Sequence, residues 1–264
     1  MRSEVVSIAA VDRERLFAIY ETHYDGADRQ RFFDDLDEKD CVILLIEESR
    51  GADVLVRPPR GSAATAAWAD EGVRPSKAHE TVVGFSTQKV FTFGGVRILF
   101  SGDTIIDPRH WGTQELVRAW CRFAGRTKAE APDTPLYWFL ISKGHRTYMY
   151  LPLFFARFHP SCDHEPDDFE RDLMHRLGNA KFGNRYDFAT GLIDERAPLD
   201  RLKPEIDSAL DRTRNRHVAF FIDRNPHYAD GVELLCLTEI STENMRSFAR
   251  REMERGMAEM LVAR

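Results

Sequence analysis

Apolar and polar side chains alternate over residues 81–93, and a second, largely apolar segment covers residues 96–106. This pattern predicts two antiparallel β-strands joined at Gly94 and Gly95, because glycine readily takes the positive φ angles of a two-residue hairpin turn. A turn over 107–113 then leads into a segment with helical apolar spacing, which predicts a helix with one buried face. The apolar positions of that helix are Leu116, Val117, Trp120, Phe123 and Ala124.

Other segments of the first half also carry clear patterns. The continuous apolar runs 41–46 and 136–142 predict strands that are covered on both faces. Asp12 is a suitable N-cap for a helix whose apolar-to-aromatic face holds Leu16, Phe17, Tyr20 and Tyr24. Further helices are expected over 30–36 and over 144–151, the latter with a kink at Pro152. Residues 49–80 predict a surface insertion, which could be either a lid over a site or a tolerated loop.

The second half predicts a helical insertion over 159–216, in which Phe169, Leu173 and Leu177 stripe one helix that ends at Gly178. The apolar runs 217–222 and 232–237 predict the last β-hairpin of the sheet. A final helix, capped by Ser241, carries a methionine stripe that favours either core packing or a homodimer contact. We therefore expect a single domain with a core over 1–158, the insertion over 159–216, and a last segment over 217–264.

Composition narrows the class of protein. The 264-residue chain is 43% hydrophobic and 30% charged, as in ordinary globular proteins. Its net charge of −6 argues against nucleic acid or an anionic membrane surface as partner, because both need a basic footprint. No signal peptide and no run of roughly 20 apolar residues is visible, so a cytoplasmic location is expected. The cysteines lack paired spacing and are expected to be reduced.

The segment Arg109-His110-Trp111-Gly112-Thr113-Gln114 lies between a predicted strand and an amphipathic helix. It is similar to the pyrophosphate loop of GNAT-type acyltransferases, which carries Gln or Arg, two variable residues, Gly, one variable residue, then Gly or Ala. Arg109 and Gly112 match this pattern, whereas Gln114 replaces the small residue. An ordinary strand–helix connection is the alternative. The resemblance implies an α/β (α+β) fold with a GNAT-like mixed, twisted central sheet flanked by helices, with the helical insertion before the last β-hairpin.

The resemblance also implies an activity. It predicts transfer of an acyl group from acyl-CoA, or from an acyl-carrier protein, to an amine or similar nucleophile of a small molecule in a ternary complex. The cofactor-binding candidates are the six loop residues, with backbone N–H groups of Trp111 to Gln114 and the Arg109 side chain on the pyrophosphate. The rival classes are a non-catalytic GNAT-fold binding or regulatory protein and an oligomeric interaction protein.

Several residues are candidates for chemistry. Asp103 could serve as general base if burial raises its pKa, or it could simply bond to neighbouring backbone. Tyr148 or Tyr150 could protonate the leaving thiolate, although a buried tyrosine in the core is the commoner case. Tyr20, His23 and Tyr24 border the expected acceptor pocket and are the substrate-binding candidates.

Two further features have simpler explanations. The segment 159–165 holds two His and one Cys, but it lacks a second ligand pair with structural zinc spacing. We therefore predict a polar loop and no metal. The aromatic residues over 137–158 would suit either a core or a bulky, apolar acyl group.

Overall fold

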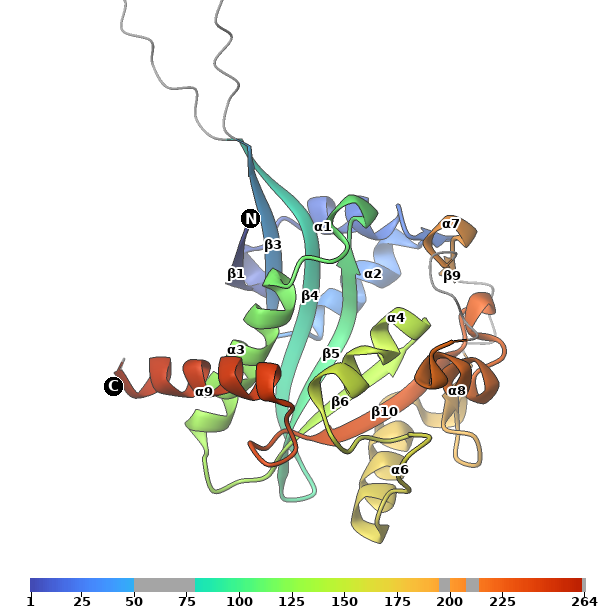
Figure 1. The fold of residues 1–264 in the computed structure, drawn as a ribbon. Coiled ribbons are helices and arrows are strands. Elements are labelled where there is room, and N and C mark those ends of the chain that lie inside the picture. Colours follow the sequence, from blue (N-terminus) through green and yellow to red (C-terminus); the bar gives the residue numbers. More distant parts are fainter. Residues whose placement is uncertain (50–78, 195–199, 208–213, 263–264) are drawn as a thin grey trace, which may run out of the picture.

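The hairpin around Gly94 and Gly95 forms the centre of the sheet, as the alternation predicts. A computed structural model describes residues 1–49, 79–194, 200–207 and 214–262, and Figure 1 shows their arrangement. The hairpin strands β4 (His79–Phe93) and β5 (Val96–Ile106) are antiparallel, and both turn glycines have positive φ angles of 59° and 84°.

Within the described residues the strands form an eight-stranded sheet in the order β1-β3-β4-β5-β6-β10-β8-β7. All neighbouring pairs are antiparallel except β5 and β6, which are parallel. The sheet is therefore mixed. The other strands of this sheet are β1 (Arg2–Ser7), β3 (Cys41–Ser49), β6 (Leu136–Ser142), β7 (Tyr186–Asp187), β8 (Leu192–Ile193) and β10 (Glu233–Glu239), and β2 (Tyr24–Asp25) pairs separately with β9 (Arg201–Leu202).

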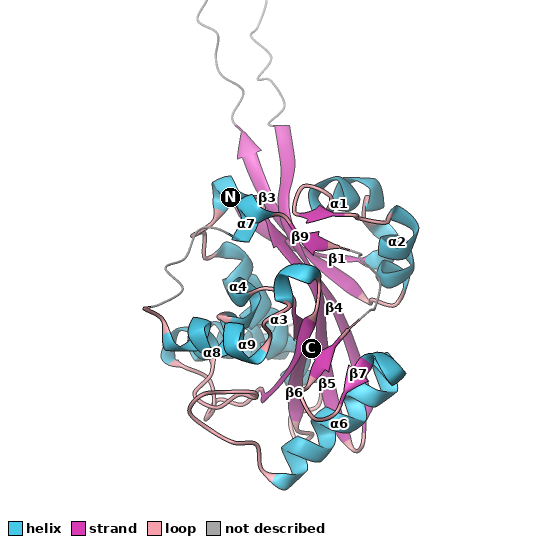
Figure 2. Ribbon diagram, turned by 90° about the vertical axis from the view of Figure 1, so that its right-hand side faces the viewer, coloured by secondary structure: helices cyan, strands magenta, loops and turns pink. Residues whose placement is uncertain are grey.

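Helices cover both faces of this sheet, and Figure 2 shows the two layers in side view. One face packs on α3 (Glu115–Glu130), α4 (His145–Tyr148), α5 (Tyr150–Phe154), α8 (Arg216–Arg224) and α9 (Ser247–Val262). The other face packs on α1 (Arg13–Tyr20), α2 (Arg29–Asp37) and α6 (Asp168–Phe182). The predicted α/β class is confirmed, because the chain forms a large mixed sheet that is flanked by helices. The short helix α7 (Pro204–Asp207) lies at the edge beside β9.

Strands β5 and β6 separate after a short stretch of pairing. Their parallel register extends from Arg97 opposite Leu136 to Ser101 opposite Leu140. Strand β5 then continues to Ile106, and no described residue pairs with it on this side. At the same point the register of β5 against β4 shifts, so that Thr87 faces both Gly102 and Asp103. Such a β-bulge bends the strand and redirects its side chains. The divergence therefore exposes the last part of β5.

Helices α3 and α9 pack unusually closely. A Cβ atom on Gly125 would overlap the carbonyl group of Met253, and one on Gly256 would overlap that of Arg122. Buried Glu252 accepts a 2.9 Å bond from Arg122 Nε across the same contact. Met253 and Met245 are buried, so these methionines of the predicted stripe belong to the core.

Several predictions about local structure are wrong. Residues 217–222 belong to helix α8, which Asn215 caps by accepting from the N–H groups of His217 and Val218, so the last hairpin lacks its first predicted strand. Helix α6 continues past Gly178 to Phe182, because that glycine only makes room for the ring of Tyr186.

The predicted helical insertion also contains strands, and the first helix ends earlier than predicted. Strands β7 and β8 of residues 159–216 extend the main sheet beyond β10. Helix α1 ends at Tyr20, so His23 and Tyr24 lie beyond it. Residues 50–78 of the predicted surface insertion lie outside the described part of the chain. None of the described helices is long and apolar enough to cross a membrane.

Candidate functional site

Two cavities meet where β5 leaves β6. The polar cavity, of about 290 Å³, lies on the α2 side, and the apolar cleft, of about 630 Å³, lies on the α3 side. Both are lined by Tyr24, Thr104 and Thr147, so they adjoin through the gap between the strands. The two cavities therefore share a boundary at these residues.

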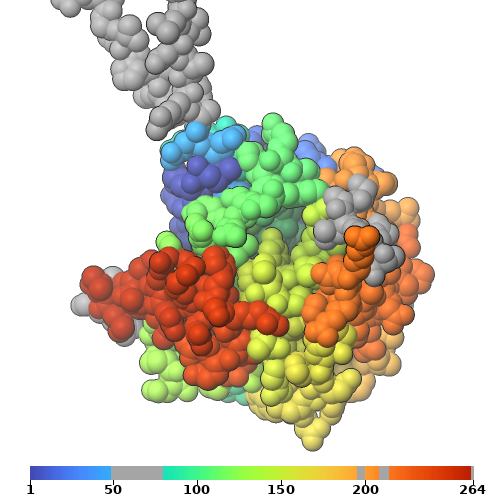
Figure 3. Space-filling model, viewed as in Figure 1, coloured from blue at the N-terminus to red at the C-terminus, as the bar shows by residue number. Residues whose placement is uncertain are grey.

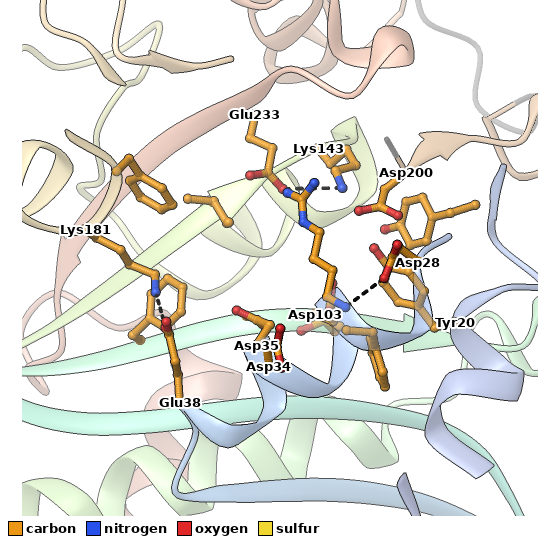
Figure 4. A pocket seen from close by; sticks show the side chains of 18 of the residues that line it. Tyr20, Asp28, Asp34, Asp35, Glu38, Asp103, Lys143, Lys181, Asp200 and Glu233 are labelled. Atoms are coloured by element: carbon orange, nitrogen blue, oxygen red, sulfur yellow. Dashed lines mark hydrogen bonds and ion pairs between the residues drawn. The ribbon is translucent and has the colours of Figure 1, made fainter. Parts of the chain in front are cut away.

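The polar cavity is rich in carboxylates, which Figure 4 shows converging from α2, β5, β10 and the segment before β9. Lys181 pairs with Glu38 at 2.9 Å, and Lys143 lies 3.7 Å from Glu233. The lining of the cavity still holds more carboxylates than cationic side chains. The lining acids are Asp28, Asp34, Asp35, Glu38, Asp103, Asp200 and Glu233, against the bases Arg31, Lys143, Lys181 and Arg185.

Asp103 lies in this cavity and is one of the two bulge residues opposite Thr87. Burial, reinforced by the neighbouring Asp35 carboxylate, raises the pKa of Asp103 to about 7, although Lys143 and Lys39 oppose the rise. Lys39 is itself buried and bonded to Asp35 at 2.6 Å. A carboxyl group with such a pKa can accept a proton near neutral pH, which suits a general base.

The three predicted substrate-binding residues all line the cavities, in different ways. The rings of Tyr20 and Tyr24 are in tilted contact, with centres 4.7 Å apart, and form the aromatic wall of the polar cavity. Lys143 Nζ lies 4.9 Å from the Tyr24 ring centre. His23 is buried at the edge of the apolar cleft, where its Nε2 atom lies 3.1 Å from the carbonyl oxygen of Ile106. Burial lowers the pKa of His23, so a structural link between α1 and β5 is its clearest role.

The apolar cleft lies at the start of α3, and Figure 3 shows the surface hollowed where the green residues leading into α3 meet the yellow-green residues of α4 and α5. Trp111, Gly112, Thr113 and Gln114 line it. Gly112 has a φ angle of 96°, and no atom lies within 4 Å of the Cβ position it lacks. Gln114 makes no capping bond with its side chain. The first-turn N–H group of Glu115 donates to Thr113 Oγ1 at 3.4 Å, whereas the structure shows no capping bond from the N–H groups of Leu116 and Val117 to a described residue.

Arg146 is the cation that the cleft offers to such a ligand. Its Nε and Nη2 atoms are buried without a hydrogen-bond partner among the described residues, and its guanidinium lies 3.8 Å from the centre of the Trp111 ring. Burial lowers the pKa of Arg146, although the nearby Asp207 carboxylate opposes this. An arginine stays charged in proteins, so these unsatisfied donors favour an anion.

Arg109 and His110, by contrast, do not line the cleft. The Arg109 side chain is 80% exposed and bonds to Asp107 at 2.7 Å, which lowers the pKa of Asp107 to about 2. His110 lies 3.8 Å from Glu47. Of Arg109 and Gly112, the two residues that match the loop pattern, only Gly112 therefore lines the cleft.

The two tyrosine candidates have different surroundings. Tyr148 is fully buried, and its hydroxyl donates a 2.8 Å bond to the carbonyl oxygen of Pro160, away from both cavities. Tyr150 lines the apolar cleft, and the structure shows no hydrogen bond from its hydroxyl to a described residue. Burial raises the pKa of Tyr150, which keeps it protonated. Tyr150 is the remaining candidate for a proton donor.

One group of possible metal ligands occurs among the described residues. Cys162 Sγ lies 3.5 Å from His217 Nδ1, and one ligand atom of each of Cys162, Asp163 and His217 lies within 4.8 Å of the others. Asp163 already pairs with Arg216 at 2.7 Å. The segment 159–165 includes Cys162 and Asp163, but its pattern does not point to His217, which lies 55 positions after Cys162.

Sequence reasoning also missed Arg146, Thr104 and the carboxylates of α2. Arg146 lies two residues before Tyr148, in a segment whose tyrosines are its candidates from the resemblance. The run Asp34-Asp35-Leu36-Asp37-Glu38 was a visible signal of an acidic helix face. The sequence pattern does not show that this helix face lies opposite β5.

Neither a protein-family model nor a curated protein sequence matches this chain. Two solved structures are distantly similar. A conserved protein of unknown function from Enterococcus faecalis V583, described as a probable N-acyltransferase, has a TM-score of 0.35 and 11% identity over 60% of this chain and 33% of its own. This chain thus matches about a third of that protein's length. A chain of the KacTA–DNA complex has a TM-score of 0.32 and 16% identity over 59% of this chain and 86% of its own. Likenesses this low do not define the function of the chain.

Proposed function

We propose that the protein transfers an acyl group from acyl-CoA to an amine. The observation that carries this proposal is the junction of an apolar cleft and a carboxylate-rich cavity at the divergence of β5 and β6, with Tyr24, Thr104 and Thr147 common to both. A thioester lying in the gap would meet an amine that enters from the opposite side of the sheet. Direct attack in a ternary complex requires this arrangement.

The cleft suits the donor. Its apolar lining includes Met149, Leu153 and Phe248, which would contact a pantetheine arm or acyl chain. The open N–H groups at the start of α3 and the unpartnered guanidinium nitrogens of Arg146 would bind the diphosphate. A diphosphate matches this paired arrangement better than the single phosphodiester of an acyl-carrier protein, so CoA is the preferred donor.

The polar cavity suits a cationic acceptor. Its excess of carboxylates would attract an amine that arrives protonated, and an acceptor with a second positive charge would gain most. Asp103, with its pKa raised to about 7, would take the proton that makes the amine a nucleophile. The acceptor nitrogen then bonds to the thioester carbon, and the C–S bond breaks as the Tyr150 hydroxyl gives its proton to the departing thiolate. The nitrogen loses its second proton in forming the amide, and that proton restores the Tyr150 hydroxyl.

Calorimetric titration with acetyl-CoA tests the donor, and release of free CoA thiol in the presence of 1,4-diaminobutane or butylamine tests the transfer. We expect saturable binding, and faster thiol release with the diamine than with the monoamine. Gly112→Pro should abolish binding, because proline cannot take the positive φ of this position. Wild-type protein that binds acetyl-CoA without releasing thiol to any amine would instead support a binding or regulatory role. Absence of binding would contradict the proposal.

A further inference from the structure

A chain of buried hydrogen bonds runs under the junction of the two cavities and ends at Thr104. Trp138 Nε1 donates to Ser101 Oγ at 2.9 Å, and Trp120 Nε1 donates to the same atom at 3.3 Å. Ser101 Oγ donates to Gln88 Oε1 at 2.7 Å. Gln88 Nε2 donates to Ser86 Oγ at 2.7 Å, and Ser86 Oγ lies 2.7 Å from Thr104 Oγ1.

The bulge in β5 makes this chain possible. Side chains alternate along a strand, so residues three apart normally point to opposite faces. The extra residue of the bulge changes this, because Thr87 faces both Gly102 and Asp103. Ser101 therefore pairs with Gln88, and Thr104 pairs with Ser86. Gln88 and Ser86 are two apart in β4 and point to the same face of the sheet. Thr104 therefore lies on the α3 side of the sheet, next to the apolar cleft.

Each proton in the chain has a defined direction. An indole N–H can only donate, so Ser101 Oγ accepts from both tryptophans. The Ser101 hydroxyl therefore donates its own proton to Gln88 Oε1. The Gln88 amide then donates to Ser86. Ser86 is 2% exposed, and among the described residues the acceptor within reach of its hydroxyl proton is Thr104 Oγ1. A buried hydroxyl without an acceptor is costly, so Ser86 donates and Thr104 keeps its own proton for another partner.

Thr104 faces the place where a ligand would supply that partner. It lines the polar cavity, the apolar cleft and a small recess of about 20 Å³ between Trp120, Trp138 and Tyr150. No other hydrogen bond joins its hydroxyl to a described residue. A recess of this size accepts little more than a methyl group or a water molecule.

We infer that the Thr104 hydroxyl donates a hydrogen bond to the thioester carbonyl oxygen of the bound donor, and that the chain from Trp138 to Ser86 holds it in that orientation. This inference rests on the proposed function and adds a catalytic residue to it. When the amine nitrogen bonds to the carbonyl carbon, the C=O electron pair moves to the oxygen, and the Thr104 proton stabilises that charge without being transferred. The pair returns as the C–S bond breaks. Donors fixed before the reaction stabilise such an oxyanion most effectively.

The test compares Thr104→Val and Thr104→Ser with the wild type. The isosteric valine removes the hydroxyl, whereas serine restores it. We expect Thr104→Val to lower kcat about 10²-fold, the usual effect of losing one oxyanion donor, with little change in the KM for acetyl-CoA, and Thr104→Ser to recover most of the rate. Thr92→Val is the control, because Thr92 is exposed on β4 and lines neither cavity.

The infrared carbonyl stretch of bound [1-¹³C]acetyl-CoA gives a readout that needs no acceptor. Loss of the hydrogen bond should move the stretch to higher frequency in Thr104→Val, and the stretch should stay unchanged in Thr92→Val. Unchanged stretch and unchanged kcat in Thr104→Val would overturn the inference while leaving the proposed function intact. A wild-type protein that does not bind acetyl-CoA would overturn both.

Discussion

The guanidinium carbon of Arg146 lies 3.8 Å from the centre of the Trp111 ring, across the part of the apolar cleft where α3 begins. This stacking fixes a cation whose Nε and Nη2 atoms have no hydrogen-bond partner among the described residues. Trp111 is held in turn by a 2.9 Å bond from its Nε1 to the carbonyl oxygen of Ile106. The pair thus ties the helix start to the end of β5.

We predict that Arg146→Ala weakens CoA binding about 10- to 100-fold. A hydrogen bond to a charged group contributes about 1.5–3 kcal/mol, and each 1.4 kcal/mol changes affinity about tenfold. Arg109→Ala is the matched control from the loop that the sequence favoured, and it should have little effect because Arg109 is exposed and bound to Asp107. Calorimetry on both variants checks this. A larger loss of CoA affinity in Arg109→Ala than in Arg146→Ala would instead show that Arg109 binds the diphosphate.

The two tyrosines should separate function from stability. Tyr150→Phe should lower kcat by about 10²-fold or more, as expected for loss of a general acid, with little change in thermal stability. Tyr148→Phe should keep kcat and lose about 1 kcal/mol of stability, because a buried hydrogen bond to Pro160 is lost. Turnover and thermal denaturation of both variants test the assignment. Full activity of Tyr150→Phe would remove Tyr150 from the mechanism.

Asp103 should set the pH dependence of turnover. Because its pKa is raised to about 7, kcat/KM should rise as pH increases through that value and then level off. Asp103→Asn should abolish this limb and lower the rate about 10²- to 10⁴-fold. A pH–rate profile with its rising limb intact in Asp103→Asn would show that another group is the base.

The same raised pKa has a consequence for stability. Ionisation of Asp103 is harder in the folded protein than in the unfolded chain, so the stability present below the unfolded pKa of about 3.9 is lost as pH rises through about 7. Asp103→Asn should therefore unfold at a higher temperature than the wild type above pH 7, and the difference should shrink at pH 4. Denaturation scans at both pH values measure it.

The close packing of α3 on α9 gives a prediction about the fold alone. Gly125→Ala should lower stability by about 1–3 kcal/mol, the usual effect of an overpacked core, because its Cβ would overlap the Met253 carbonyl. Ala258→Ser, on the exposed side of α9, is the control. Equal unfolding temperatures for the two variants would mean that the helices separate without cost.

The sequence was informative where local chemistry determines structure. The Gly94-Gly95 turn, the Asp12 cap and the strand–turn–helix unit follow from short-range rules, and all are observed. Helix α8 was misread because 217–222 is nearly all apolar, although only Val218 and Phe221 of these are buried. Asn215 before it was an unused cap signal.

The site was less predictable, because long-range packing assembles it. Asp103, Trp111, Gly112 and Tyr150 were nominated from a local resemblance and do line the cavities. The partners that matter lie far away in the chain: Asp35 on α2, Glu233 on β10, and Ser86 on β4. The bulge opposite Thr87 has no clear signature in the sequence, yet it decides which face Thr104 occupies.

A crystal structure of the wild-type protein with CoA bound would test the central claim most directly. We predict density for the diphosphate within hydrogen-bond distance of the first-turn amides of α3 and of Arg146, with the thiol entering the gap where β5 leaves β6 beyond Ser101 and Leu140. Density for CoA elsewhere on the protein, or an apolar cleft that stays empty at saturating CoA, would contradict it.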